Sequence, residues 1–271
     1  MKKIFLRFPF ASRMLLAVVL GTMAIIGSQF IYNLLPFLKF YFPFVGEVLL
    51  LLVTAILFRT DGQNLSAIGL NLSLKNVCLL FLGLTIGIVA LGIATMLRTL
   101  YTGEQWQVAT TINAGALLKS LYYILPTVTV QELMFRGYPF TKTISLVGVI
   151  KANIIFALLF MLIHVLDEEV LQNPVRIIML AIAIPVGHLF FAAGLLRTKT
   201  LLFPIGLHWG NNWAVTHLVG WNNNETVIFY VTDQKIYTEW LPFIILMIIF
   251  NGFFLLITWL IWRCRKPLAK L

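Results

Sequence analysis

Eight long apolar stretches separate this chain from water-soluble proteins. A helix needs about 20 mostly apolar residues to cross a hydrocarbon core of about 30 Å. In lipid, the backbone N–H and C=O groups must pair within the protein, so each stretch is expected to form a helix. We therefore predict an all-α polytopic membrane bundle of about eight transmembrane helices, with spans at residues 14–33, 42–58, 76–97, 120–141, 152–166, 175–196, 200–219 and 241–262.

The composition agrees with a bundle whose main partner is the lipid bilayer. Of the 271 residues, 60% are hydrophobic and 11% are charged, and the mean hydropathy is +0.94. These values exclude a water-soluble enzyme, a secreted disulfide scaffold and a disordered tail. The 20 Lys and Arg lie in small groups between apolar stretches, so no nucleic-acid partner is expected. Cys78 and Cys264 are too few for a disulfide framework or a metal cluster.

The charged residues between the spans favour one orientation in the membrane. Cytoplasmic segments of membrane proteins collect Lys and Arg. With the N-terminus in the cytoplasm, the inner segments hold fourteen basic residues and one acid, Asp61, whereas the outer segments hold five basic and eight acidic residues. We therefore expect a multi-pass protein of the bacterial cytoplasmic membrane, with both termini cytoplasmic and residues 167–169 outside. The apolar run after Arg13 continues to about Leu35, which predicts a retained span rather than a cleaved signal.

The connections between the spans are too short to form separate domains. The longest, at about 59–75, 98–119 and 220–240, carry turn sequences such as Asn222–Asn224. The sequence has no internal repeat of solenoid period and no low-complexity tract. We therefore predict a single transmembrane domain over residues 1–271.

One acid and one base lie inside a predicted span. Glu132 and Arg136 are four residues apart, which puts them on one face of a helix, where they can neutralise each other. Each such charge costs about 2.5–3.5 kcal/mol in a span, so these residues usually face the bundle interior and mark function. A purely structural salt bridge explains this pair alone equally well.

Two other spans carry polar residues with the same spacing. His164 follows a phenylalanine by four residues, and Asn212 follows His208 by four. Imidazole can hold or relay a proton near neutral pH, and an Asn amide can donate a hydrogen bond to a developing oxyanion. We expect these groups and the Glu–Arg pair to converge in one cavity. The other two histidines, His188 and His217, are expected to be structural.

The three pairs resemble the motifs of the CAAX prenyl protease and bacteriocin-processing family, also called CPBP or Abi, whose members are eight-span intramembrane endopeptidases. The family motifs are Glu-Glu-x-x-x-Arg, Phe-x-x-x-His and His-x-x-x-Asn. The sequence around the motifs is also similar, as in the Phe-Arg-Gly-Tyr run that ends the first. The resemblance is firm over about residues 121–213, the expected family core. The matching positions are Gln131, Glu132 and Arg136, then Phe160 and His164, then His208 and Asn212.

The resemblance implies endoproteolysis of a membrane-anchored protein or peptide, such as a prenylated CAAX protein or a leader peptide. His164 would hold the attacking water, and His208 with Asn212 would stabilise the oxyanion. Arg136 would fix Glu132. Zinc could bind at His164 and His208 together with an acid. An oxyanion hole uses the Asn amide better and needs no metal, so no cofactor is predicted.

Residue 131 departs from the family pattern. The first glutamate of the family is taken to activate the water, but an amide such as that of Gln131 cannot accept a proton at any relevant pH. Adjacent helical residues point about 100° apart. Glu132 could therefore serve both the water and Arg136 only in a distorted helix, and Pro126 could supply the distortion. Three explanations stay open: a natural variant that uses Glu132, a member that has lost proteolysis, and an engineered glutamine that stops turnover.

Two other classes of function compete with the protease. A catalytically impaired family member could act as a membrane scaffold or as a bacteriocin-immunity protein. A transporter with a proton-coupled Glu-Arg-His cluster is disfavoured, because the two halves of the chain lack the similarity that many transporters show. The sequence favours a protease whose activity depends on the effect of Gln131.

Overall fold

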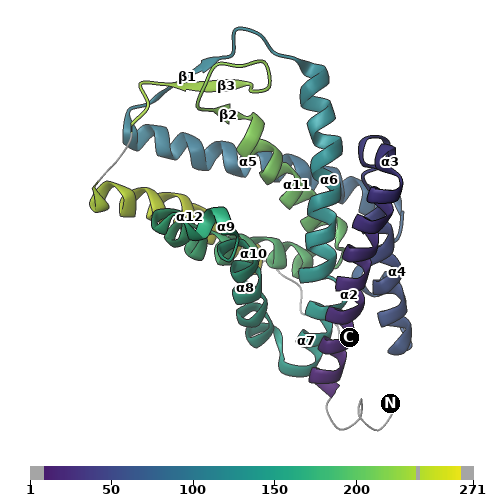
Figure 1. Cartoon of the computed structure of the whole chain (residues 1–271). Helices are drawn as coiled ribbons and strands as arrows, with labels where there is room; N and C mark the ends of the chain where they lie inside the picture. Colours follow the sequence, from purple (N-terminus) through teal and green to yellow (C-terminus); the bar gives the residue numbers. More distant parts are fainter. Residues whose placement is uncertain (1–8, 236–238, 264–271) are drawn as a thin grey trace.

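A computed structural model describes residues 9–235 and 239–263 as an all-α helical bundle with one small sheet, which confirms the predicted fold class (Figure 1). The first half contains α2 (Pro9–Leu34), α3 (Pro36–Tyr41), α4 (Val45–Thr60), the 3-10 helix η1 (Leu65–Ile68), α5 (Leu74–Thr102) and α6 (Ala114–Arg136). The second half contains α7 (Tyr138–Val147), α8 (Val149–Val165), α9 (Glu168–Leu171), α10 (Pro174–Thr198), α11 (Leu202–His217) and α12 (Trp240–Arg263).

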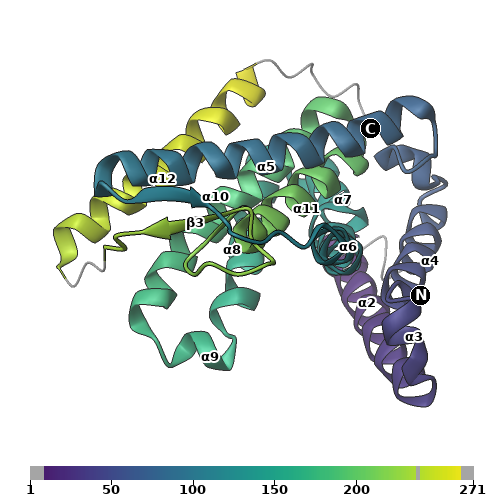
Figure 2. The ribbon, with the colours of Figure 1, turned by 90° about the horizontal axis from the view of Figure 1, so that it is seen from above.

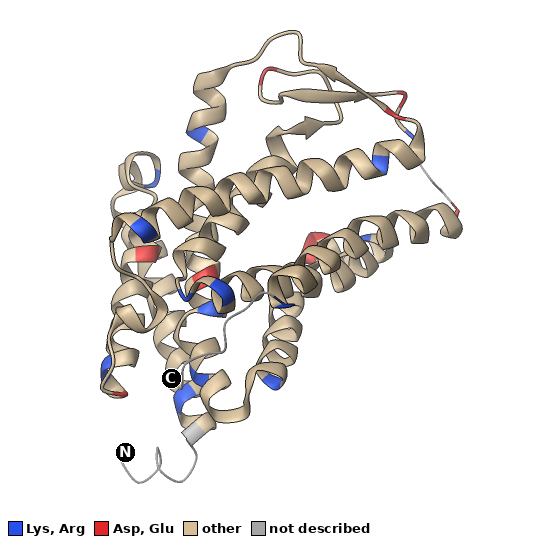
Figure 3. Cartoon of the chain, turned by 180° about the vertical axis from the view of Figure 1, so that it is seen from behind, with Lys and Arg blue, Asp and Glu red and all other residues tan. Residues whose placement is uncertain are grey.

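Helices cover most of every predicted span. Within the described chain, α2, α5, α10 and α12 are long and apolar enough to cross a membrane, and α8 is a shorter apolar helix. Only 11% of the most apolar window of α12 is buried in the protein, so most of its apolar side chains are at least partly exposed, as in a helix with lipid on one side. Figure 3 shows charged positions mainly near helix ends and in loops, with long uncharged stretches between them. The number of eight crossings stays a prediction.

The prediction of one continuous helix over residues 120–141 is wrong. Helix α6 continues through Pro126 but ends at Arg136, and α7 starts again at Tyr138. Gly137 makes the break possible, because a Cβ in its backbone conformation would lie 2.2 Å from the carbonyl oxygen of Leu133. A proline in the first turn of α7 is tolerated there, since the first N–H groups of a helix have no intrahelical partner.

The long helices cross one another rather than run parallel. Figures 1 and 2 show α5 stretched across the molecule, whereas α6 is seen nearly end-on in Figure 2. Helix α4 packs between α2 and α6, while α5 packs against α11 and α12, and α10 packs against the same two helices. The buried apolar side chains form two clusters, and α6, α10 and α11 contribute to both. These three helices therefore connect the two clusters of the bundle.

Helices α5 and α11 pack through reciprocal glycine pairs. Gly83 and Gly87 of α5 face the backbone of α11, and Gly206 and Gly210 of α11 face the backbone of α5. A Cβ at Gly206 would lie 2.0 Å from the carbonyl oxygen of Leu80. Small residues at four-residue spacing let membrane helices approach closely and gain van der Waals contact. This contact fixes the position of α11, which carries the third motif.

A small sheet joins two predicted loops that had shown only turn sequences. Its strands are β1 (Gln105–Val108), β2 (Val219–Gly220) and β3 (Phe229–Thr232), in the order β1-β3-β2. Strands β1 and β3 are antiparallel, whereas β2 and β3 are parallel. The Phe-Tyr-Val-Thr sequence of β3 suits a strand, but its partner is too distant along the chain for a local pattern to reveal. The sheet lies at the opposite end of α6 from α7 (Figure 1).

Gly206→Ala should lower the stability of the protein, because the added methyl group would collide with the backbone of α5. Overpacking of this kind typically costs about 1–3 kcal/mol. Thermal unfolding of the purified protein in detergent measures the effect. Gly252→Ala on α12 is the matched control, since no atom lies within 4 Å of its Cβ position. Equal unfolding temperatures for the two variants would contradict the close α5–α11 contact.

Candidate active site

The carboxylate of Glu132 joins two of the three motifs. Its side chain is fully buried in α6. Its Oε1 accepts a hydrogen bond from Arg136 Nη1 at 2.9 Å and another from His208 Nδ1 at 2.8 Å. Arg136 lies one turn further along α6, as the four-residue spacing predicts, whereas His208 comes from α11. One buried oxygen therefore holds side chains of two helices.

Aromatic rings enclose the guanidinium group of Arg136. Its central carbon lies 4.2 Å from the centroid of the Phe160 ring and 5.4 Å from that of Phe191. Phe191 also stacks on the imidazole of His208, with ring centroids 4.5 Å apart. Cation–π attraction reaches about 2 kcal/mol when the pair is desolvated. The phenylalanine of the second motif thus stabilises the arginine of the first.

His164 is held in one tautomer. Its Nδ1 lies 2.7 Å from the carbonyl oxygen of Phe160, one turn earlier in α8. A carbonyl oxygen only accepts, so Nδ1 carries the proton of the neutral ring, and Nε2 is left as an acceptor. The imidazole also packs edge-on against the Phe160 ring, with centroids 4.6 Å apart. The Phe-x-x-x-His motif therefore positions an imidazole nitrogen that can accept a hydrogen bond.

The three motif helices meet at a cavity of about 390 Å³. Four of the six predicted site residues line it, namely Gln131, His164, His208 and Asn212. The buried Glu132–Arg136 pair is one layer removed and reaches the cavity wall through His208. The Oε1 of Gln131 is buried and has no hydrogen-bond partner among the described residues. The structure thus brings the predicted groups together, in two layers.

The cavity also contains polar residues that the motifs do not include. Asn211 lines it from α11, and Asn251 lines it from α12. Most of the remaining wall is apolar and comes from α10 and α12. The sequence signal for Asn251 was a single amide inside the predicted span 241–262, because polar residues in spans usually face the bundle interior. No spacing pattern connected it to the three motifs.

The other two histidines are outside the cavity wall. His188 is fully buried in α10, packs edge-on against Phe140 with centroids 5.6 Å apart, and finds no hydrogen-bond partner within the described chain. The Nδ1 of His217 lies 2.7 Å from the carbonyl oxygen of Thr226 and ties the end of α11 to the following loop. Neither position indicates a catalytic role, so both histidines are still interpreted as structural.

The donors at the cavity do not suit a catalytic zinc ion. Such sites use three protein ligands and keep a fourth position for water. No group of three His, Cys, Asp or Glu side chains that could hold a metal is found in the described part of the chain. His164 and His208 supply two nitrogens, and the one carboxylate nearby, that of Glu132, is engaged with Arg136 and His208.

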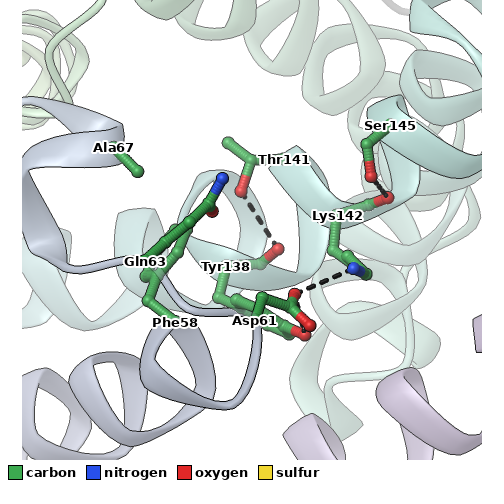
Figure 4. A pocket seen from close by; sticks show the side chains of 8 residues that line it. All are labelled: Phe58, Asp61, Gln63, Ala67, Tyr138, Thr141, Lys142 and Ser145. Atoms are coloured by element: carbon green, nitrogen blue, oxygen red, sulfur yellow. Dashed lines mark hydrogen bonds and ion pairs between the residues drawn. The ribbon is translucent and has the colours of Figure 1, made fainter. Parts of the chain in front are cut away.

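A second cavity, of about 200 Å³, lies beside α7 and contains none of the predicted site residues (Figure 4). Asp61, at the end of α4, forms ion pairs with Arg13 of α2 and Lys142 of α7, both at 2.8 Å. Tyr138 donates a hydrogen bond to the same carboxylate at 2.9 Å. These contacts hold α7 against α2 and α4 directly after the first motif. They fix the direction in which the chain leaves α6.

Residues 113–214 match the family described as type II CAAX prenyl endopeptidase Rce1-like. This part of the chain is similar to that family, and we call it the Rce1-like segment. All of the motif residues fall inside the matched segment, so the resemblance expected from the three motifs is confirmed. No curated protein and no solved structure is significantly similar to the chain.

The Rce1-like segment contains α6 to α10 and most of α11. Helices α2, α4, α5 and α12 lie outside it. Two of these helices nevertheless position the site, because α5 holds α11 through the glycine contact and α12 supplies part of the cavity wall. The family motifs therefore account for the polar groups at one side of the cavity and not for its whole lining.

Glu132→Gln should destabilise the protein by about 3–5 kcal/mol, because Arg136 would stay buried without a counter-charge. Adding Arg136→Gln should recover part of the loss, since the double variant buries no isolated charge. Thermal unfolding in detergent measures the stability of Glu132→Gln, of Arg136→Gln and of the double variant. If the double variant loses the full sum of the two single losses, the two residues do not act as a pair.

Proposed function

We propose that this protein is an intramembrane endopeptidase of the CAAX type, which hydrolyses a peptide bond of a membrane-anchored protein or peptide by attack of water. Its Rce1-like segment supports this reaction at the level of the family. The observation that carries the proposal is the meeting of three motif helices at one cavity, with imidazole and amide groups on an otherwise mostly apolar wall. Such a chamber suits a peptide held out of bulk water.

In this mechanism His164 holds the attacking water. Its Nδ1–H donates to the Phe160 carbonyl, so the lone pair on Nε2 can accept a hydrogen bond from the attacking water. As the water oxygen bonds to the scissile carbonyl carbon, the proton of the water passes to Nε2, because the Gln131 amide offers no base. The same proton is then available for the leaving amine. A carboxylate positioned at residue 131 as the general base would contribute about a further 10²–10⁴-fold.

Asn212 and His208 are the groups that stabilise the tetrahedral oxyanion. The Asn212 amide donates a hydrogen bond to that oxygen, and His208 does so from Nε2 when the ring is protonated. Because His208 Nδ1 already points at the Glu132 carboxylate, a proton on Nε2 would create an imidazolium beside a negative charge. Donors fixed in advance cost no reorganisation during the reaction.

The geometry supports a positioning role for Glu132 rather than a role as the base. Its Oε1 already accepts two hydrogen bonds. Its Oε2 has no hydrogen-bond partner among the described residues, but it is buried, and Glu132 does not line the cavity. Gln131 occupies the wall position instead and can hydrogen-bond the water without taking its proton. We therefore expect slow turnover from this chain, whether the glutamine is natural or engineered.

The same glutamine favours a second candidate function. A member of the family with an impaired site could retain the cavity and act as a membrane scaffold or as a bacteriocin-immunity protein. The buried pair and the ordered wall would then hold a peptide without cleaving it. Activity measurements on the variants below separate this candidate from a slow protease.

Gln131→Glu should raise the rate of peptide cleavage by about 10²–10⁴-fold, because it adds a carboxylate that can act as general base at the cavity. The assay uses purified protein in liposomes, an S-farnesylated peptide with a C-terminal CAAX sequence, and product detection by mass spectrometry. Gln172→Glu, at an exposed position after α9, is the charge-matched control. Adding His164→Ala to Gln131→Glu should abolish the gain. No cleavage by any variant would favour the scaffold.

We further propose that the protein is in the bacterial cytoplasmic membrane with both ends in the cytoplasm, as the excess of basic residues in the inner segments indicates. Reporter fusions test this orientation. A reporter after Lys270 should be active in the cytoplasm, and one inserted at residues 167–169 should be active outside. An external signal from the C-terminal fusion would require an odd number of crossings.

A further inference from the structure

Asn251 brings a polar group from α12 into the wall of the same cavity. It stands in the middle of an apolar helix, outside the Rce1-like segment, and its side chain is 5% exposed. Its Oδ1 is buried and has no hydrogen-bond partner among the described residues. A buried acceptor of this kind normally has a partner, since leaving it unpaired costs free energy.

The orientation of the amide is fixed by the helix itself. Asn251 Nδ2 donates a hydrogen bond of 2.9 Å to the carbonyl oxygen of Met247, one turn earlier. That oxygen can only accept, so the NH₂ group must face it and Oδ1 must be the remaining group. The unpaired atom is thus an acceptor, and its partner must be a donor.

The cavity holds a second unpaired acceptor, Gln131 Oε1, on α6. Around these two oxygens the lining from α10 and α12 is largely apolar, with Phe190, Phe250 and Phe254 among it. A peptide in such a chamber has no water for its backbone N–H groups, and an unpaired buried N–H costs several kcal/mol in an apolar medium. Acceptors on the wall are therefore what a peptide ligand needs.

We propose that Asn251 is a substrate-binding residue whose Oδ1 accepts a hydrogen bond from one backbone N–H of the peptide in the cavity. This inference rests on the proposed function and extends it to a helix outside the family segment. This hydrogen bond fixes the position of the peptide along the cavity. The backbone N–H that binds Asn251 determines which peptide carbonyl group lies beside His164 and Asn212. The ligand is thus an extended peptide, recognised by its main chain rather than by a side-chain charge.

Binding can be measured on the protein as it is, since its turnover is expected to be slow. The probe is a fluorescent S-farnesylated peptide ending in a CAAX sequence, with the protein in lipid nanodiscs. Asn251→Leu should weaken binding by about 5- to 10-fold, which corresponds to one hydrogen bond. Thr258→Val is the matched control, because Thr258 makes the same backward hydrogen bond on α12 but does not line the cavity.

A series of peptides, each N-methylated at a single backbone position, identifies the donor. At one position, methylation should weaken binding of the peptide to the native protein by about 5- to 10-fold. The same methylation should not change the affinity of the Asn251→Leu variant. Asn251→Ser is the reserve variant if Asn251→Leu fails to fold. A serine hydroxyl can keep the hydrogen bond to the carbonyl oxygen one turn earlier, but the longer amide and its Oδ1 are gone from the cavity. Unchanged affinity in the variants, or equal N-methyl effects in both backgrounds, would overturn the inference.

Two further outcomes separate this inference from the proposed function. If adding Asn251→Leu to Gln131→Glu leaves the cleavage rate unchanged at every peptide concentration, the role of Asn251 is wrong. The proposed protease function would then still stand. Binding that depends on Asn251, without cleavage by any variant, would reject the protease and leave the peptide site intact. If methyl 3-(farnesylthio)propionate, which keeps the farnesyl thioether and the ester but has no N–H group, shows the same loss on Asn251→Leu, the main-chain contact is wrong.

Discussion

The buried carboxylate of Glu132 is the interaction on which the site depends. An isolated charge at this depth would be costly, and its pairing with Arg136 makes it tolerable. Because the same oxygen also accepts from His208, the charge that stabilises α6 orients a ring on α11. The phenylalanine rings around Arg136 exclude water from the pair, so a change in any of these groups reaches the cavity wall through His208.

Helix α11 is consequently held from two sides by different forces. On one side its glycines lie against the backbone of α5, a contact that depends on the absence of side chains. On the other side His208 is bound by an ionised group of α6. The first contact sets the distance between helices and the second sets the rotation of α11. Together they place Asn212, one turn beyond His208, at the cavity without a direct contact to Glu132.

Much of this arrangement follows from local sequence patterns, and the rest does not. The helices and the Glu132–Arg136 pair could be predicted, because apolar length and four-residue spacing are properties of one segment. The break at Gly137 was missed, since its cause is a backbone conformation rather than a loss of apolar character. The glycine contact and the pairing of β1 with β3 each join residues more than 100 positions apart, which no local pattern contains. Asn251 meets the motif residues only where the folded helices line one cavity.

The amide at position 131 offers hydrogen bonding at the cavity wall without a negative charge. An acid there would combine hydrogen bonding with a charged group that can act as a base. Glu132 and Arg136 neutralise each other behind the wall, so the wall itself presents neutral imidazole and amide groups. A carboxylate in place of Gln131 would activate water, but it would also put an unpaired charge on an apolar chamber. With the amide, the hydrogen-bonding shape is kept without the charge and without a carboxylate base. The wall then presents what a neutral peptide backbone needs for binding and lacks the carboxylate that we expect to speed its hydrolysis.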